Sequence, residues 1–97
     1  DTSISALKKI TDVKTRYYIR FQAIDKPGVL SAISNILGKH NISIASVIQK
    51  EKRREKEVPI IMMTHEANEL DIRAALSLID KLVSIKKKTI AIRIESL

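Results

Sequence analysis

The chain has 97 residues, which is enough for one compact domain with a single modest core and too few for two. Hydrophobic residues make up 44% of the sequence and charged residues 30%, a balance typical of a folded globular domain. Because the chain has no cysteine, disulfides, thiolate metal sites and cysteine nucleophiles are excluded. It shows neither a membrane-spanning apolar run nor a secretory signal pattern, so we expect a cytoplasmic protein without membrane contact.

The first fourteen residues are polar, with three apolar residues at a spacing of three: Ile4, Leu7 and Ile10. This spacing permits a short surface helix or a linker. The first residue, Asp1, is not methionine, so we expect a fragment or a processed chain. We predict that residues 1–14 join an upstream part to a domain formed by residues 15–97.

Alternation of period two predicts a first strand over Tyr17–Ile24. The apolar face of this strand comprises Tyr17, Ile19, Phe21 and Ala23. The turn Asp25–Gly28 ends the strand, and apolar residues at helical spacing predict a helix that begins at Val29. The pair His40-Asn41 closes this helix, because asparagine tolerates the left-handed conformation found at helix ends.

A second strand is predicted over Ser43–Gln49, and a third, nearly all apolar, over Val58–Thr64. Between them, Lys50–Glu57 consists of eight charged residues in succession. Such a run is too polar to be buried, so we interpret it as the tip of a hairpin.

Asn68 is a good N-cap for a second helix, which we expect to end near Leu82. The last strand, Thr89–Glu95, directs Ile90, Ile92 and Ile94 to one face. The order strand, helix, strand, strand, helix, strand predicts an α+β fold of the ferredoxin-like βαββαβ type. Two helices then pack on one face of a four-stranded antiparallel sheet.

No set of residues has the composition of a catalytic centre or a metal site. The two histidines, His40 and His65, lie in unrelated segments without spacing that would join them in one metal site. Gly28 and Gly38 are the two glycines, so glycine-rich nucleotide-binding loops are excluded. We therefore predict a chain with no catalytic residues, no metal and no cofactor of its own.

The turn that precedes the first helix carries the most chemical information. The helix start leaves backbone N–H groups unpaired, which suits the α-carboxylate of an amino acid, and Asp25 is placed to accept the α-ammonium group. Gly28 lets a ligand approach the backbone closely. In the alternative interpretation, Asp25 caps the helix through a local turn and Pro27 presets the first helical dihedral.

The predicted strand Ser43–Gln49 lies at a sheet edge in the ferredoxin-like strand order, and its side chains are uncharged and mostly small. An edge of this kind favours pairing with a second copy of the chain. The alternative is that the neighbouring charged loop protects the edge from pairing.

Four stretches resemble the ACT domain, the small-molecule regulatory module of amino-acid metabolism. They are Tyr17–Phe21, Asp25–Leu30, Asn41–Gln49 and Val58–Glu66. The turn Asp-Lys-Pro-Gly-Val-Leu is typical of ACT domains in general. The stretch that ends in Ser-Val-Ile-Gln and the block from Val58 to Glu66 are similar to homoserine dehydrogenases in particular.

The resemblance implies a C-terminal regulatory domain that follows an NAD(P)-dependent homoserine dehydrogenase part and senses threonine, for feedback control of aspartate-derived amino acids. It implies a homodimer in which the turn of one chain meets the second strand of its partner. The implied ligand residues are Asp25, Gly28, Val29, Leu30, Ser43 and Ile44. The implied dimer edge comprises Ser43, Ala45, Ser46, Val47 and Gln49.

Two rival functions remain. A module that serves only for oligomerisation predicts the same sheet pairing without a response to amino acids. The net charge of +7 also passes the first test for RNA binding. RNA-binding sheets stack bases on exposed aromatic residues, however, and Tyr18 is the one candidate on the outward face of the first strand, so we expect no nucleic acid.

Overall fold

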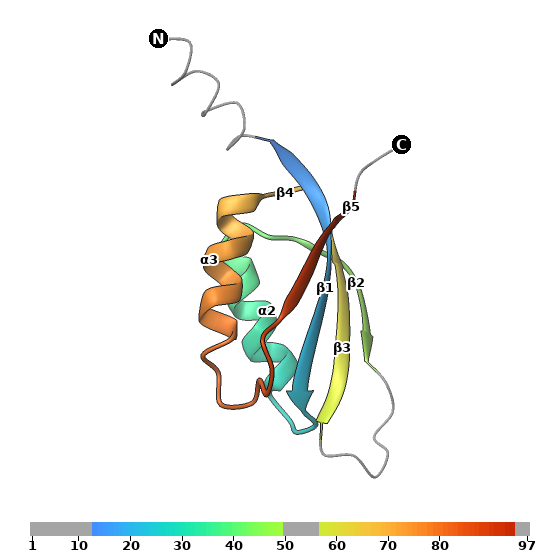
Figure 1. Ribbon diagram of the computed structural model, residues 1–97, viewed down its shortest axis with the longest axis vertical. Helices are drawn as coiled ribbons and strands as arrows, with labels where there is room; N and C mark the ends of the chain where they lie inside the picture. Colours follow the sequence, from blue (N-terminus) through green and yellow to red (C-terminus); the bar gives the residue numbers. More distant parts are fainter. Residues whose placement is uncertain (1–12, 50–56, 95–97) are drawn as a thin grey trace.

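The computed structural model describes residues 13–49 and 57–94 (Figure 1). Most of the predicted linker, most of the predicted hairpin tip and Glu95 lie outside the described residues. In the described part of the chain, no helix is both long enough and apolar enough to cross a membrane.

The described residues form two helices and five strands. In chain order these are β1 (Lys14–Ile24), α2 (Val29–Lys39), β2 (Ile44–Gln49), β3 (Glu57–Thr64), β4 (Ala67–Asn68), α3 (Glu69–Ile79) and β5 (Ile90–Ile94). All the predicted elements are present. The two-residue strand β4 is the addition, and it pairs with the start of β1.

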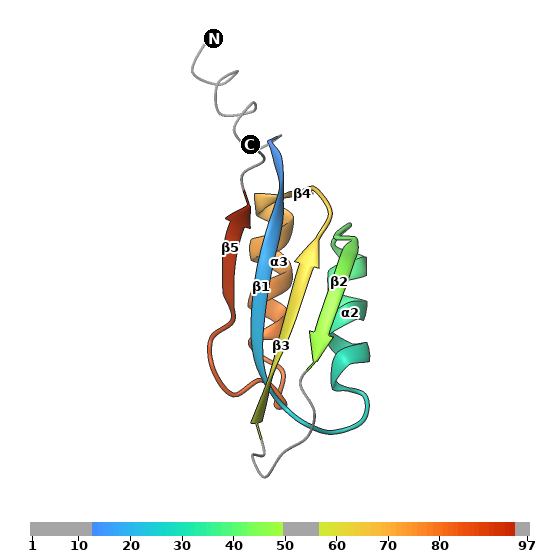
Figure 2. The same ribbon diagram turned by 90° about the vertical axis from the view of Figure 1, so that its right-hand side faces the viewer.

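The sheet is antiparallel, with β1 between β3 and β5 and with β2 at the outer edge beside β3. Both helices lie on one face of this sheet, and Figure 2 shows the other face open, with α2 behind the β2 edge. The ferredoxin-like α+β fold predicted from the sequence is therefore confirmed.

The core forms on the helix-covered face of β1 and β3. The apolar side chains of β1 predicted to share one face are all buried there, at 4% exposure or less. They meet the apolar stripe of α2, formed by Val29, Ile33 and Leu37, and that of α3, formed by Ile72, Ala75 and Ile79. Burial of these side chains is the main favourable term in folding the domain.

The helix ends follow the signals in the sequence with one difference. Asn41 has a φ of 60°, the left-handed conformation expected after α2, and the Asn68 side chain accepts a hydrogen bond of 2.8 Å from the Leu70 amide at the start of α3. Helix α3 ends at Ile79, before the expected Leu82. There the Leu82 amide donates to the Ile79 carbonyl in a tight turn, so the apolar Leu82 packs on the core from outside the helix.

Two threonines on the core side of the sheet differ in their hydrogen bonding. The hydroxyl of Thr64, fully buried, accepts from the Tyr17 amide at 3.0 Å and donates to the His65 carbonyl at 2.7 Å. The hydroxyl of Thr15 is buried, and among the described residues it has no hydrogen-bond partner. Thr64 therefore continues the ladder between β1 and β3 with its side chain, whereas Thr15 does not.

We expect Thr64→Val to lower the free energy of unfolding by about 1–3 kcal/mol, because it leaves the Tyr17 amide and the His65 carbonyl without their partner. Thr15→Val is the matched control, since it makes the same change of shape on β1 and removes a hydroxyl that has no partner. Its effect should be neutral or stabilising. Urea unfolding of both variants checks this, and an equal loss in the two would contradict the assigned role of Thr64.

Candidate functional site

The end of β1 is held firmly before the chain turns into α2. The Ile24 amide donates to the Ser84 carbonyl at 2.8 Å, and the Lys86 amide donates to the Gln22 carbonyl at 2.9 Å. The Lys26 amide then donates to the Ile24 carbonyl at 3.1 Å, which makes Asp25 the central residue of a three-residue turn. The segment that follows α3 therefore fixes the position from which α2 starts.

Helix α2 begins without a cap. Its N-cap residue is Gly28, and the amides of Val29, Leu30 and Ser31 have no acceptor among the described residues. No acidic residue lies in the first turn. Helix α3, by contrast, has the Asn68 cap and two acidic residues in its first turn. The positive end of the α2 dipole is thus the one left without a negative partner.

Asp25 lies beside this helix start and is half-buried. Among the described residues its carboxylate has no hydrogen-bond or ion-pair partner. The capping role offered by the alternative interpretation of the turn is therefore not observed. A carboxylate and amide donors, all without partners among the described residues, therefore lie within six residues of one another along the chain, and such a set of groups suits the two charged ends of a zwitterion.

A cavity of about 380 Å³ opens at this corner of the molecule. It is lined by Lys26, Pro27, Gly28, Val29, Ala32, Leu82, Val83 and Ser84. Two of the predicted ligand residues, Gly28 and Val29, line it, and Asp25 and Leu30 do not. The contribution of residues 82–84 was not predicted, because they reach this corner through the tertiary fold. Val83 is 81% exposed in the structure, and no local sequence pattern indicates that it lines a cavity.

The other two predicted ligand residues, Ser43 and Ile44, lie at the opposite end of the sheet. Ile44 pairs with Thr64, whereas the turn end of the sheet is marked by the pair Ile24 and Glu57. A single chain therefore does not bring Ser43 and Ile44 to the turn.

Strand β2 forms a free edge of the sheet, since β3 is its one pairing partner among the described strands. The ladder has an irregularity between Ile44 and Ser46, so Ala45 stands out of register. The residues from Ser46 to Gln49 are exposed, and none of them is charged. The edge position predicted for this strand is confirmed.

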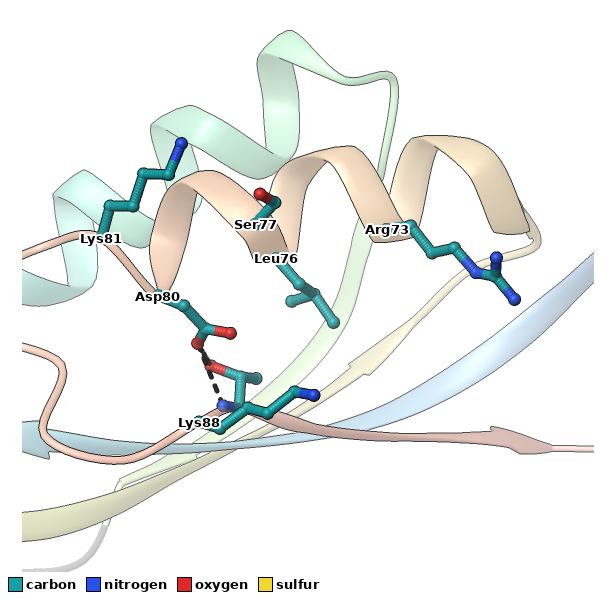
Figure 3. Close-up of a pocket in the computed structure, with 7 residues that line it drawn as sticks. Arg73, Leu76, Ser77, Asp80, Lys81 and Lys88 are labelled. Atoms are coloured by element: carbon teal, nitrogen blue, oxygen red, sulfur yellow. Dashed lines mark hydrogen bonds between the residues drawn. The ribbon is translucent and has the colours of Figure 1, made fainter.

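A second hollow, of about 510 Å³, lies between α3 and the segment that leads into β5 (Figure 3). Asp80 Oδ1 accepts hydrogen bonds there from both the amide and the hydroxyl of Thr89. The basic side chains of Arg73 and Lys81 point away from each other, and Arg73 pairs with Glu69 at 3.3 Å. This hollow has no converging donors, so the corner at α2 is the better candidate site. Over the residues described, no group of three or more metal-ligating side chains exists.

The ACT domain profile matches residues 17–84, which include most of β1, both helices and the turn with its free donors. The chain belongs to the ACT domain family. Curated relatives of this ACT domain include the homoserine dehydrogenases of Methylobacillus glycogenes, 39% identical over 91% of the chain, and of Pseudomonas aeruginosa, 36% identical over 87% of the chain. The chain spans about a fifth of the length of these relatives, 22% and 20% respectively.

Solved structures agree with this assignment. The homoserine dehydrogenase from Thiobacillus denitrificans matches with a TM-score of 0.79 and 37% identity, over 89% of the chain and 19% of its own. The regulatory subunit of aspartate kinase from Thermus thermophilus matches with a TM-score of 0.58 and 16% identity, over 84% of the chain and 52% of its own. The latter similarity shows the fold alone. The domain is thus an ACT domain related to the homoserine dehydrogenases.

We expect Gly28→Ala to lower the free energy of unfolding by about 1–2 kcal/mol, because Gly28 has a φ of 88° and L-residues are strained there. The cost is conformational, since an added Cβ at Gly28 meets no atom within 4 Å. Gly38→Ala should stabilise α2 by about 0.5–1 kcal/mol, because an added Cβ is equally unhindered there and the φ of Gly38 is not positive. Thermal unfolding measures the stability of both variants. The melting temperature should fall for Gly28→Ala and rise for Gly38→Ala.

Proposed function

We propose that the chain is the amino-acid-sensing regulatory domain of a homoserine dehydrogenase, with threonine as its effector. The observation that supports this most directly is the free carboxylate of Asp25 beside the uncapped start of α2. The relatives support the enzyme class, because homoserine dehydrogenases match almost the whole chain. In this proposal the missing part of a cytoplasmic polypeptide binds NAD(P) and carries out the reaction, and this domain contributes no catalytic group.

Recognition follows from the charges of an amino acid at neutral pH. The α-carboxylate accepts hydrogen bonds from the free amides of Val29 and Leu30 and gains from the positive end of the helix. The α-ammonium group donates to Asp25. Gly28 leaves open space above the backbone, so the ligand approaches without meeting a side chain. No covalent bond is made or broken, so occupancy of the site depends on the concentration of the free amino acid.

The second half of the site comes from a partner in this proposal. When two β2 strands pair antiparallel, the start of one lies beside the end of the other. The end of β2 lies toward the turn, since Gln49 pairs with Ile60, near the start of β3. Such pairing brings the partner's β2 start, Ser43 and Ile44 in the same numbering, to the corner where α2 begins. A homodimer therefore completes a pocket that one chain leaves open.

Threonine is expected to raise the melting temperature of the chain, by about 4–8 °C for each kcal/mol of binding free energy at saturation. Asp25→Asn should weaken threonine binding by about tenfold to a hundredfold, because a hydrogen bond to a charged group contributes about 1.5–3 kcal/mol. Isothermal calorimetry on wild type and variant measures this loss.

The matched control is Asp71→Asn, which removes a carboxylate from the first turn of α3 and leaves the α2 corner unchanged. It should alter basal stability slightly and keep threonine binding. If wild type responds to no amino acid but still dimerises, the module serves for assembly alone and the sensing proposal is wrong.

Val47→Lys tests the dimer edge, because Val47 lies near the middle of β2, where two antiparallel copies come closest. The variant places two positive charges side by side, and we expect sedimentation analysis to shift from dimer to monomer. Leu78→Lys introduces the same charge on the exposed side of α3 and should leave the dimer intact. A dimer that survives Val47→Lys would rule out pairing through this edge.

A further inference from the structure

The helix-free face of the sheet is unusually apolar. By register, Ile90, Ile92 and Ile94 of β5 lie on this face, opposite Arg20, Tyr18 and Arg16 of β1. Ile90 and Ile92 are 56% and 55% exposed, and Ile48 of β2, on the same face, is 59% exposed. Half-buried Ile61 and Met63 of β3 lie beside Ile48, and β1 separates them from β5. We call this set of side chains the open apolar face. Figure 2 looks directly onto these strands, with both helices behind them.

A single basic residue stands in the middle of this surface. Arg20 pairs by register with Ile61 on one side and with Ile90 on the other. Its side chain is exposed, and it has no hydrogen bond or ion pair to any residue that the structure describes. Arg16, further along β1, already donates from Nε to the Thr64 carbonyl at 3.0 Å. Arg20 is therefore a free cation at the centre of the open apolar face.

The combination of exposed apolar side chains and an unpaired arginine restricts which surfaces can cover this face. Contiguous exposed apolar residues are typical of surfaces that bind another protein. Covering Ile90 and Ile61 also removes water from Arg20, and a buried guanidinium without a partner is strongly unfavourable. A partner must therefore supply a carboxylate opposite Arg20. Half-buried Tyr18 is the one aromatic side chain that the described strands place on this face, and isoleucines offer no surface for base stacking, so RNA fits this face poorly.

A second copy of the chain does not fit either. In the described strands, Glu57 is the one acidic residue on the face, and it lies at the start of β3 beside Ile24. If two copies stack with the centres of these faces together, Arg20 meets the centre of the other face, where the described strands carry no acidic residue. Both cations would lose water without gaining a counterion.

We propose that the open apolar face docks onto an apolar surface that carries a carboxylate opposite Arg20, and that this surface belongs to the remaining part of the same polypeptide. The proposal rests on the proposed parent, since the matched relatives are about five times longer than this chain and have the additional mass to provide such a surface. The docking leaves the β2 edge and the α2 corner uncovered, so it is compatible with dimerisation and with ligand binding.

The test compares the reaction of a cysteine at position 92 with a maleimide in two proteins, read at that position by peptide mass spectrometry. One protein is the Ile92→Cys variant of the full polypeptide, and the other is the same variant of the 97-residue chain, which has its own core and no other cysteine. We expect labelling at least tenfold slower in the full polypeptide. Ser31→Cys, on the exposed side of α2, should react equally in both proteins.

The role of the Arg20 charge in docking is tested in the full polypeptide. Adding Arg20→Glu to Ile92→Cys should restore fast labelling, whereas Arg20→Lys should keep the protection. Arg93→Glu makes the same charge change on the helix side of β5 and should have no effect. Equal labelling of position 92 in both proteins overturns the proposal. Labelling of the isolated chain that becomes slower as the concentration of that chain rises also overturns it, because it would indicate that a second copy covers the face. Threonine binding is measured independently, so either proposal can fail while the other stands.

Discussion

The whole domain depends on the one-sided burial of strand β1. It lies between β3 and β5, and every second side chain from Tyr17 to Ala23 is enclosed beneath both helices. A sheet covered by helices on one face only must leave its other face, its outer strands and its end turns to solvent or to partners. The three surfaces to which we assign proposed functions are these exposed parts.

The α2 corner follows directly from how β1 ends. The Ser84 carbonyl and the Gln22 carbonyl hold the last residues of β1 against the segment after α3, and the chain then turns at Asp25 and Gly28 into an uncapped helix. Recognition by backbone amides requires that those amides be fixed in position before the ligand arrives. The packing of Val29 in the core supplies that rigidity, since the first residue of α2 is buried.

The three surfaces are separate, which allows one small domain to combine several contacts. The α2 corner lies at the end of the sheet, β2 forms an outer edge, and the helix-free face looks away from the helices. Because Ser43 directly precedes β2, at the end of the strand away from the α2 corner, the proposed pocket would be completed only when two chains pair. Dimerisation and ligand binding would then stabilise each other through the same strand.

The sequence alone determined the positions of most helices and strands, because these depend on local periodicity and local turn chemistry. The alternation of Tyr17 to Ala23, the helical stripe from Val29 and the cap at Asn68 each specify their element through neighbouring residues, and the ACT-like turn indicated the family. The tertiary structure decided what depends on distant segments: the place of residues 82–84 in the cavity at the α2 corner, the separation of Ser43 from Asp25, and the isolation of Arg20 among isoleucines of other strands. These features arise from strand pairing and register between residues far apart in the chain, which no local pattern encodes.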